Sequence, residues 1–227
     1  MQTDRTSEWF VPKFGPRAFR ISVGMLFLPY TGIIVSYAVW GSLSGPFEIE
    51  RLGAICLIYF LALGVSAHCL DAIGGKTRPW GELPKKRVLA IALVALGIAF
   101  ATGLYYAFLD APLLIPIGII EGFFLFAYNL ELFGGRFHNN ASVLVSWAIL
   151  PIFAGSVIQT NTISYEAILL SILSSALTYI LITNSRKYKE MKKSMTDPRM
   201  IYKKEIILKT LSLGIISGTM IFFVLRI

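Results

Sequence analysis

About seven long apolar segments alternate with short polar connections along the chain. Each segment holds close to the roughly 20 apolar residues that an α-helix needs to cross a hydrocarbon core about 30 Å thick. The pattern predicts an all-α polytopic membrane bundle with about seven transmembrane helices, forming a single integral membrane domain over residues 1–227. The predicted spans are 20–44, 50–72, 86–109, 111–132, 141–158, 164–184 and 205–226.

The composition agrees with a membrane protein. Of 227 residues, 56% are hydrophobic and 15% are charged, and the mean hydropathy is +0.68. This is too little polar surface to cover a soluble globule, so apolar surface must be buried in lipid. The first apolar run is too long for the core of a signal peptide, so we expect that no leader is removed. Cys56 and Cys69 fall in the second span, where we expect them to pack as small apolar residues.

The positions of lysine and arginine predict the orientation. All but three of the 21 bases fall in the N-terminal segment or in connections on one side, the exceptions being Arg51, Lys209 and Arg226. Because these bases resist translocation, we expect an integral cell membrane protein with a cytoplasmic N-terminus and an outside C-terminus. The net charge of +8 then reflects topology and attraction to anionic membrane lipids, and it does not indicate nucleic-acid binding.

One short motif occurs twice, at the ends of the second and fourth predicted spans. An acid, two apolar residues, two glycines and a base follow one another in DAIGGK at 71–76 and in ELFGGR at 131–136. A carboxylate at a helix C-terminus opposes the helix dipole and favours a compensating cation. Since Mg²⁺ binds a few carboxylates together with phosphate oxygens of a substrate, we predict Mg²⁺ as a cofactor with Asp71 and Glu131 as its ligands. The alternative is ordinary helix capping followed by a cytoplasmic base.

Bases near these acids could contact an anion. Arginine can form two parallel hydrogen bonds with an anion, and a base after two glycines stands where backbone can approach a ligand closely. The candidate bases are Lys76, Arg78, Arg136, Arg186 and Lys187, and the amide of Asn184 is a further candidate for the same ligand. We expect three further bases of the run after the sixth span to form a solvated face beside anionic lipid, namely Lys189, Lys192 and Lys193.

Three more residues are candidates for proton transfer. Glu121 lies near the middle of the fourth span, where an ionised carboxylate is costly unless it is paired or lines a polar cavity. It shares a helical face with Tyr128, so it could lie deeper in the same cavity as the acid at the mouth. His68 stands three residues before Asp71 and faces the same way. A hydrogen-bonded packing role is the alternative for Glu121 and for His68.

These motifs resemble the UbiA superfamily of intramembrane prenyltransferases. The resemblance covers roughly residues 20–193 and rests on the acidic motif closing the second span and on the segments RP, GELPKKR, AYNLELFGGRFHNN and VSWAILPIFAG. It implies an all-helical barrel with a lipid-open central cavity and a polar cap on the cytoplasmic side. It also implies that Mg²⁺ bridges aspartate-rich motifs to an isoprenyl diphosphate, which ionises to an allylic cation that a hydrophobic acceptor captures.

The resemblance assigns roles to individual residues. It places the catalytic Asp71 in the first acidic motif, Arg78 at the diphosphate, and Tyr128 at a tyrosine of the fourth helix. Asn184 would open the second motif, but residues 185–189 replace the expected aspartates with serine, tyrosine and three bases. Two ways of holding diphosphate remain, either one metal with Glu131 as the substitute ligand or direct neutralisation by the bases that follow Asn184.

The predicted function is Mg²⁺-dependent transfer of a prenyl group from an isoprenyl diphosphate to a lipid or aromatic acceptor. One alternative is a cyclase, hydratase or isomerase on the same fold. In that case the proton donor would be Glu121, His68 or Asp71. The other alternative is a membrane transporter or assembly subunit without catalysis.

Overall fold

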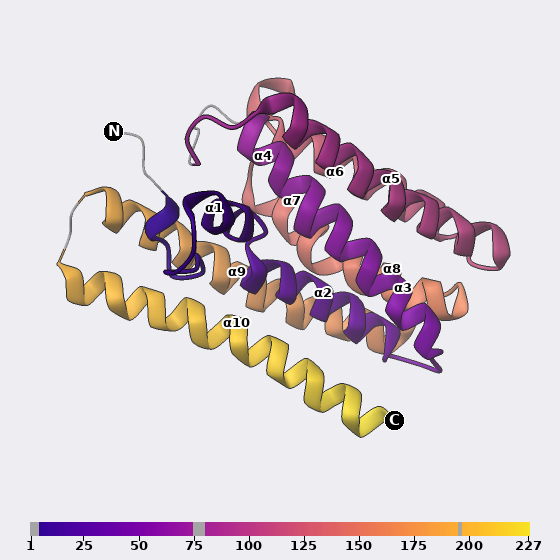
Figure 1. Ribbon diagram of the computed structural model, residues 1–227. Coiled ribbons are helices and arrows are strands. Elements are labelled where there is room, and N and C mark those ends of the chain that lie inside the picture. The colour runs from indigo at the N-terminus through magenta and orange to yellow at the C-terminus, as the bar shows by residue number, and fades with distance from the viewer. Residues whose placement is uncertain (1–4, 75–79, 195–196) are drawn as a thin grey trace.

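The computed structural model describes residues 5–74, 80–194 and 197–227, and the regular elements in these ranges are all helices (Figure 1). This confirms the predicted all-helical class for the described part of the chain. The elements are η1 (Arg5–Ser7), α1 (Arg17–Met25), α2 (Leu28–Ser42), α3 (Ile49–Tyr59), η2 (Phe60–Ala67), α4 (His68–Gly74), α5 (Lys85–Leu109), α6 (Leu114–Asn129), η3 (Phe133–Gly135), α7 (Asn140–Leu144), η4 (Val145–Ile149), α8 (Leu150–Thr160), α9 (Tyr165–Lys193) and α10 (Pro198–Arg226).

Six helical rods within the described ranges are long and apolar enough to cross a membrane. The predicted fourth span, 111–132, is shorter than expected, because α6 has 16 residues. That length corresponds to about 24 Å of helix, against a hydrocarbon core of about 30 Å. The structure therefore supports a membrane protein with six candidate spans, and the count of about seven is not confirmed.

Two of the rods contain a wider, π-helical stretch. In Ile49–Gly74, α3 continues through η2 into α4, and in Asn140–Thr160, α7 continues through η4 into α8. A π-helical turn changes the direction of the side chains beyond it and is frequent at functional sites. η2 thereby sets the direction in which His68, the first residue of α4, projects.

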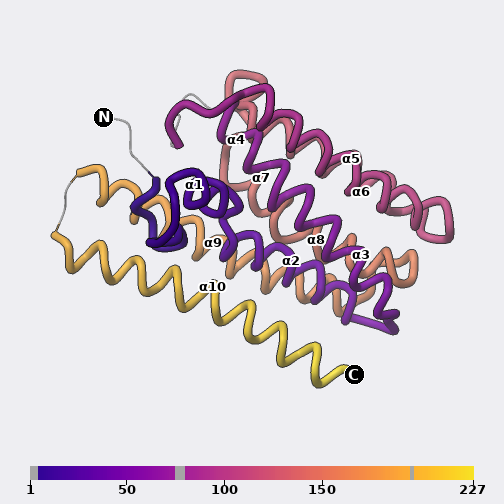
Figure 2. The backbone as a smooth tube through the Cα atoms, in the orientation of Figure 1, coloured from indigo at the N-terminus to yellow at the C-terminus, as the bar shows by residue number. Residues whose placement is uncertain are grey.

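The centre of the bundle is the contact between α2 and α8. Gly41 of α2 lies so close to the backbone carbonyl of Ile152 that a Cβ atom would clash, so only glycine allows this approach. Around it, α10 packs on the outside against α9 and α2, and α5 lies beside α6 at the opposite edge (Figures 1 and 2). The polar ends of these helices therefore come together at the two ends of the bundle.

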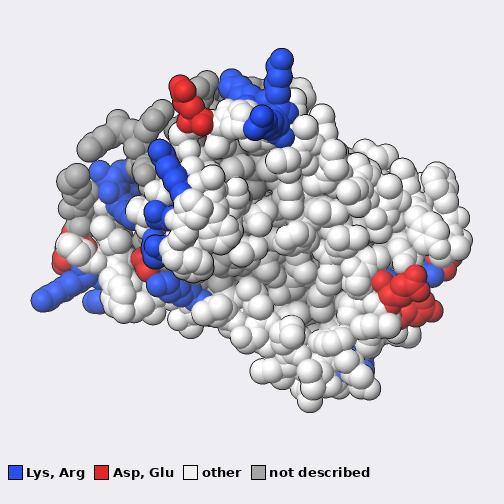
Figure 3. Space-filling view, viewed as in Figure 1, with Lys and Arg blue, Asp and Glu red and all other residues white. Residues whose placement is uncertain are grey.

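Charge is concentrated at these two ends. Lys and Arg side chains gather around the N-terminal end, an uncharged belt covers the middle, and a small acidic patch lies at the far end (Figure 3). At the far end, Arg51 contacts Asp110 at 2.6 Å and Glu48 at 3.2 Å. An uncharged belt between polar ends is the distribution that a bilayer requires. The cytoplasmic orientation of the basic end stays a prediction.

Candidate functional site

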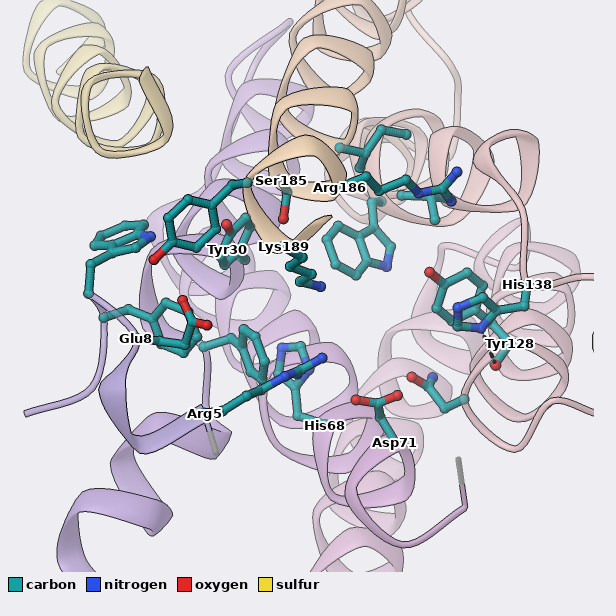
Figure 4. Close-up of a pocket in the computed structure, with 18 residues that line it drawn as sticks. Arg5, Glu8, Tyr30, His68, Asp71, Tyr128, His138, Ser185, Arg186 and Lys189 are labelled. Carbon is teal, nitrogen blue, oxygen red and sulfur yellow. Dashed lines mark hydrogen bonds between the residues drawn. The ribbon is translucent and has the colours of Figure 1, made fainter. Parts of the chain in front are cut away.

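A pocket with a volume of about 170 Å³ lies at the basic end of the bundle, and we call it the basic-end pocket (Figure 4). The N-terminal segment, α4, the end of α6 and the last turns of α9 contribute to it. The residues labelled in Figure 4 are Arg5, Glu8, Tyr30, His68, Asp71, Tyr128, His138, Ser185, Arg186 and Lys189. Four of the predicted site residues therefore share one pocket, namely His68, Asp71, Tyr128 and Arg186.

One face of α9 supplies two of the cations. Ser185, Arg186 and Lys189 line the pocket, and Lys189 follows the other two by four and three residues, spacings that bring side chains together on one side of a helix. Lys189 points into the pocket (Figure 4), a position that the sequence did not predict, although the residue is exposed like Arg186. Lys187 is exposed and does not line the pocket.

Asn184 faces a different neighbour. Its Oδ1 accepts a hydrogen bond of 2.8 Å from Lys204 of α10, and its Nδ2 donates to the carbonyl oxygen of Ile180, also at 2.8 Å. The bond from Lys204 joins α9 to α10, the bond to Ile180 lies within α9, and both use the side chain outside the basic-end pocket. The structure thus does not bring this predicted diphosphate ligand to the other candidates.

An aromatic stack forms one wall of the pocket. The rings of Phe27 and His68 stack with centroids 4.7 Å apart, and the Arg5 guanidinium carbon lies 5.2 Å from the Phe27 centroid. Phe27 separates α1 from α2 and has a left-handed backbone, with φ of 44°. Such a conformation is strained for a phenylalanine and tends to occur at functional sites.

Two buried nitrogen atoms of the pocket lining lack a partner. His68 Nε2 and Trp9 Nε1 form no hydrogen bond with the described residues. An unmade hydrogen bond of a buried group costs about 1–3 kcal/mol. The indole nitrogen can only donate, so an acceptor atom of a ligand would satisfy it. Together with the nearby cations, this favours an anionic ligand with several oxygen atoms.

The ends of α4 and α6, where the repeated motif begins, lie in contact. A Cβ atom on Gly74 would lie 3.2 Å from the carbonyl oxygen of Asn129, so the ends of the two helices are in close contact. Asp71 and Tyr128 consequently line the same pocket. Glu131 does not line it, because the chain leaves α6 through a left-handed turn in which Glu131 has φ of 49°.

The remaining predicted residues lie elsewhere. Arg136 is exposed and does not line the pocket. Lys76 and Arg78 lie outside the described residues. Glu121 lines a separate apolar pocket, where its Oε1 accepts a hydrogen bond of 3.0 Å from Tyr59. The expectation that Glu121 lies deeper in the cavity of Asp71 is therefore not supported.

The N-terminal segment contributes residues that sequence reasoning missed. Glu8 forms an ion pair of 3.2 Å with Lys192, and Arg20 donates to the carbonyl oxygens of Thr6 and Pro12 at 3.0 and 2.8 Å. The ion pair holds the segment against α9 and the Arg20 bonds hold it against α1, and Arg5 of this segment lines the pocket. No motif in the sequence marks Arg5, whereas helical spacing from Arg186 could have identified Lys189.

His138 was also missed by sequence reasoning. Its ring stacks on Tyr128 with centroids 4.2 Å apart and an angle of 18° between the planes. The chain returns to the pocket here after the turn that follows α6. Tyr128 is thus fixed in orientation at the wall of the pocket, next to Asp71 from α4 (Figure 4).

Of the two carboxylates that line the pocket, that of Asp71 forms no ion pair with the described residues. Asp71 and Glu8 are the lining carboxylates, and Glu8 is paired with Lys192. The described residues contain no group of three or more His, Cys, Asp and Glu side chains that could hold a metal. Asp71 fits an ion that also binds phosphate oxygens of a substrate, since Mg²⁺ often has one or two protein carboxylates.

Comparisons with models of known protein families, with curated proteins and with solved structures found no match to this chain. The resemblance to the UbiA superfamily therefore stays a prediction from the sequence motifs. The geometry of the basic-end pocket provides independent support for an anion-binding role.

Proposed function

We propose that the protein is an intramembrane enzyme, similar to the UbiA superfamily, that transfers the prenyl group of an isoprenyl diphosphate to a hydrophobic acceptor. One observation carries the proposal. Arg5 of the N-terminal segment meets Arg186 and Lys189 of α9, about 180 residues later in the sequence, in one pocket at the end of apolar helices. A diphosphate with an apolar chain matches this combination of cations and lipid-embedded surface.

The pocket offers more positive than negative charge to a ligand. Its lining has three bases and two carboxylates, of which Glu8 already pairs with Lys192. Guanidinium groups bind phosphate oxygens through two hydrogen bonds, and lysine acts as a point charge. His68 and Trp9 add nitrogen atoms that have no hydrogen-bond partner among the described residues. These groups suit the several oxygens of a diphosphate.

The same groups can assist departure of the diphosphate. When the bond between the prenyl carbon and oxygen breaks, both electrons leave with the diphosphate, and the bases stabilise the charge that develops there. The prenyl carbon becomes an allylic cation, and the aromatic faces of Trp147 and Tyr128 can stabilise it. Mg²⁺ held by Asp71 would supply further neutralisation of the diphosphate.

Capture by the acceptor completes the transfer. The acceptor atom forms a bond to the prenyl carbon and releases a proton. Asp71 lines the same pocket, so its carboxylate can accept that proton, as can an oxygen of the departing diphosphate. The products are the prenylated acceptor and diphosphate.

The proposal is tested with purified protein in detergent, Mg²⁺ and labelled isoprenyl diphosphates of several chain lengths. We expect saturable binding and slow release of diphosphate, which hydrophobic acceptors accelerate. Asp71→Asn should remove turnover while leaving the thermal midpoint of unfolding nearly unchanged. Full turnover in this variant, or no binding of any isoprenyl diphosphate by the wild-type protein, would overturn the proposal.

A further inference from the structure

A second pocket, which we call the apolar pocket, lies between the Ile49–Gly74 rod, α5 and α6. It has a volume of about 150 Å³. Leucine, isoleucine, phenylalanine, alanine and glycine make up its lining, except for Tyr59 and Glu121. A carboxyl group in such surroundings is expensive to bury and is not needed to hold apolar helices together.

Glu121 is only half satisfied in this pocket. Its Oε1 accepts the hydrogen bond from Tyr59 at 3.0 Å. Its Oε2 is buried and has no hydrogen-bond partner among the described residues. A buried polar atom without a partner costs about 1–3 kcal/mol, and it is explained most simply by a ligand that supplies one.

The missing partner can be described chemically. No base in the described part of the chain lines the apolar pocket, so no lining residue compensates an ionised carboxylate, and a cationic ligand would have to lose its hydration to enter. A hydroxyl group both donates and accepts hydrogen bonds. It therefore satisfies Oε2 whether or not the carboxyl group carries its proton, whereas a carbonyl oxygen satisfies only the protonated form.

The apolar pocket can be reached from the lipid phase. Several lining residues are also exposed on the outside of the bundle, among them Leu104 of α5 and Ile119 of α6. Gly103 and Gly118 face the space and leave it free of side chains. A molecule dissolved in the bilayer could thus enter sideways without crossing the charged end of the bundle.

We propose that the apolar pocket binds an uncharged lipid with one hydroxyl group, which hydrogen-bonds to Glu121 Oε2 while its hydrocarbon part lies between α5 and α6. The inference rests on one observation: a carboxyl oxygen without a hydrogen-bond partner among the described residues lies in an otherwise apolar cavity. This site is distinct from the basic-end pocket. Glu121 stands seven residues before Tyr128 on α6, a separation of about 10 Å along the helix.

Photoaffinity labelling tests the proposal on the intact protein in detergent. The probe is a long-chain primary alcohol with a diazirine in its chain, and the control probe is the same chain without the hydroxyl group. We expect the alcohol to label α5 and α6 residues of the apolar pocket at about fivefold to tenfold lower concentration than the control, because one buried hydrogen bond contributes roughly that factor. Equal labelling by both probes, or labelling mainly outside this pocket, would overturn the proposal.

Two substitutions of Glu121 test the hydrogen bond itself. Glu121→Gln keeps an acceptor for Tyr59 and a donor for the ligand, so the preference for the alcohol should change less than about threefold. The double substitution Glu121→Leu and Tyr59→Phe removes both polar groups together and leaves no unpaired hydroxyl behind. It should fold and should label equally with both probes. A preference for the alcohol that survives in the double variant contradicts the proposal.

A filling substitution tests the cavity. A Cβ atom on Gly103 would make only ordinary contact with Ile58, at 3.9 Å, so Gly103→Leu can occupy the space without a backbone clash. We expect it to reduce labelling by both probes at least about tenfold, since the chain then has no room. Unchanged labelling would mean that the probes bind elsewhere. The assays contain no diphosphate, so their outcome is independent of the function proposed for the basic-end pocket.

Discussion

The imidazole ring of His68 stacks on the ring of Phe27, with centroids 4.7 Å apart and an angle of 29° between the planes. The left-handed backbone of Phe27 turns the chain between α1 and α2 and presents the ring at this position. The stack covers one face of His68, while Nε2 is left without a partner in the lining of the basic-end pocket. The arrangement therefore fixes a nitrogen atom beside the proposed diphosphate site.

His68→Phe tests whether this nitrogen acts on a ligand. The substitution keeps an aromatic ring against Phe27 and removes an unpartnered polar atom, so we expect the thermal midpoint to stay the same or rise slightly. Binding of isoprenyl diphosphate should weaken about threefold to tenfold, and turnover at low substrate concentration should fall by a similar factor. Isothermal titration and a diphosphate-release assay measure the two effects. Unchanged binding and turnover would show that His68 only packs.

A pair of glycines tests the packing of the bundle centre. Gly41→Ala forces a Cβ atom against the carbonyl of Ile152, and we expect a loss of about 1–3 kcal/mol in the free energy of unfolding. Gly53→Ala is the matched control, since no atom lies within 4 Å of its Cβ position and alanine favours a helix over glycine. Thermal unfolding in detergent compares the two variants. Equal midpoints would contradict the close approach of α2 and α8.

The far end of the bundle should show a pH dependence of stability. Arg51 donates two hydrogen bonds to Asp110, of 2.8 and 2.6 Å, and these bonds together with its charge lower the pKa of that carboxyl below its ordinary value of 3.8. A depressed carboxyl pKa adds stability that is present above the unfolded pKa and is lost as the pH falls through the folded pKa.

The resulting prediction concerns acid conditions. We expect the thermal midpoint to be flat near neutral pH and to fall as the pH drops below about 4. Asp110→Asn should lower the midpoint at neutral pH and reduce its loss below pH 4. Because Asp110 is exposed, both effects should be small. A variant with the same acid profile as the wild-type protein would contradict this role of the Arg51 contact.

The sequence predicted the helices well because long apolar runs leave the chain few alternatives in a membrane. It predicted the length of α6 poorly. The apolar run continues to Leu132, but the helix ends at Asn129, where the left-handed turn at Glu131 begins. Composition does not reveal such a turn, since Glu131 is neither glycine nor asparagine. This turn also removed the predicted second metal ligand from the basic-end pocket.

The candidate site was predicted in part. Asp71 and His68 close a long apolar span, and acids and histidines at such positions are informative because they are costly in lipid. The choice between Arg186, Lys187 and Lys189 depended on which face of α9 meets the pocket, and this is set by packing against the rest of the bundle. Arg5 reaches the site through the fold of the N-terminal segment, which has no periodic pattern to predict it.

The most direct measurement compares diphosphate binding by Arg186→Gln and Lys187→Gln. These neighbours on α9 lose the same charge, but Arg186 lines the basic-end pocket and Lys187 does not. We predict that Arg186→Gln weakens binding of an isoprenyl diphosphate at least about tenfold, while Lys187→Gln changes it less than about twofold. Equal losses in the two variants would mean that only the general positive charge of this end attracts the ligand, and would contradict a diphosphate site in the basic-end pocket.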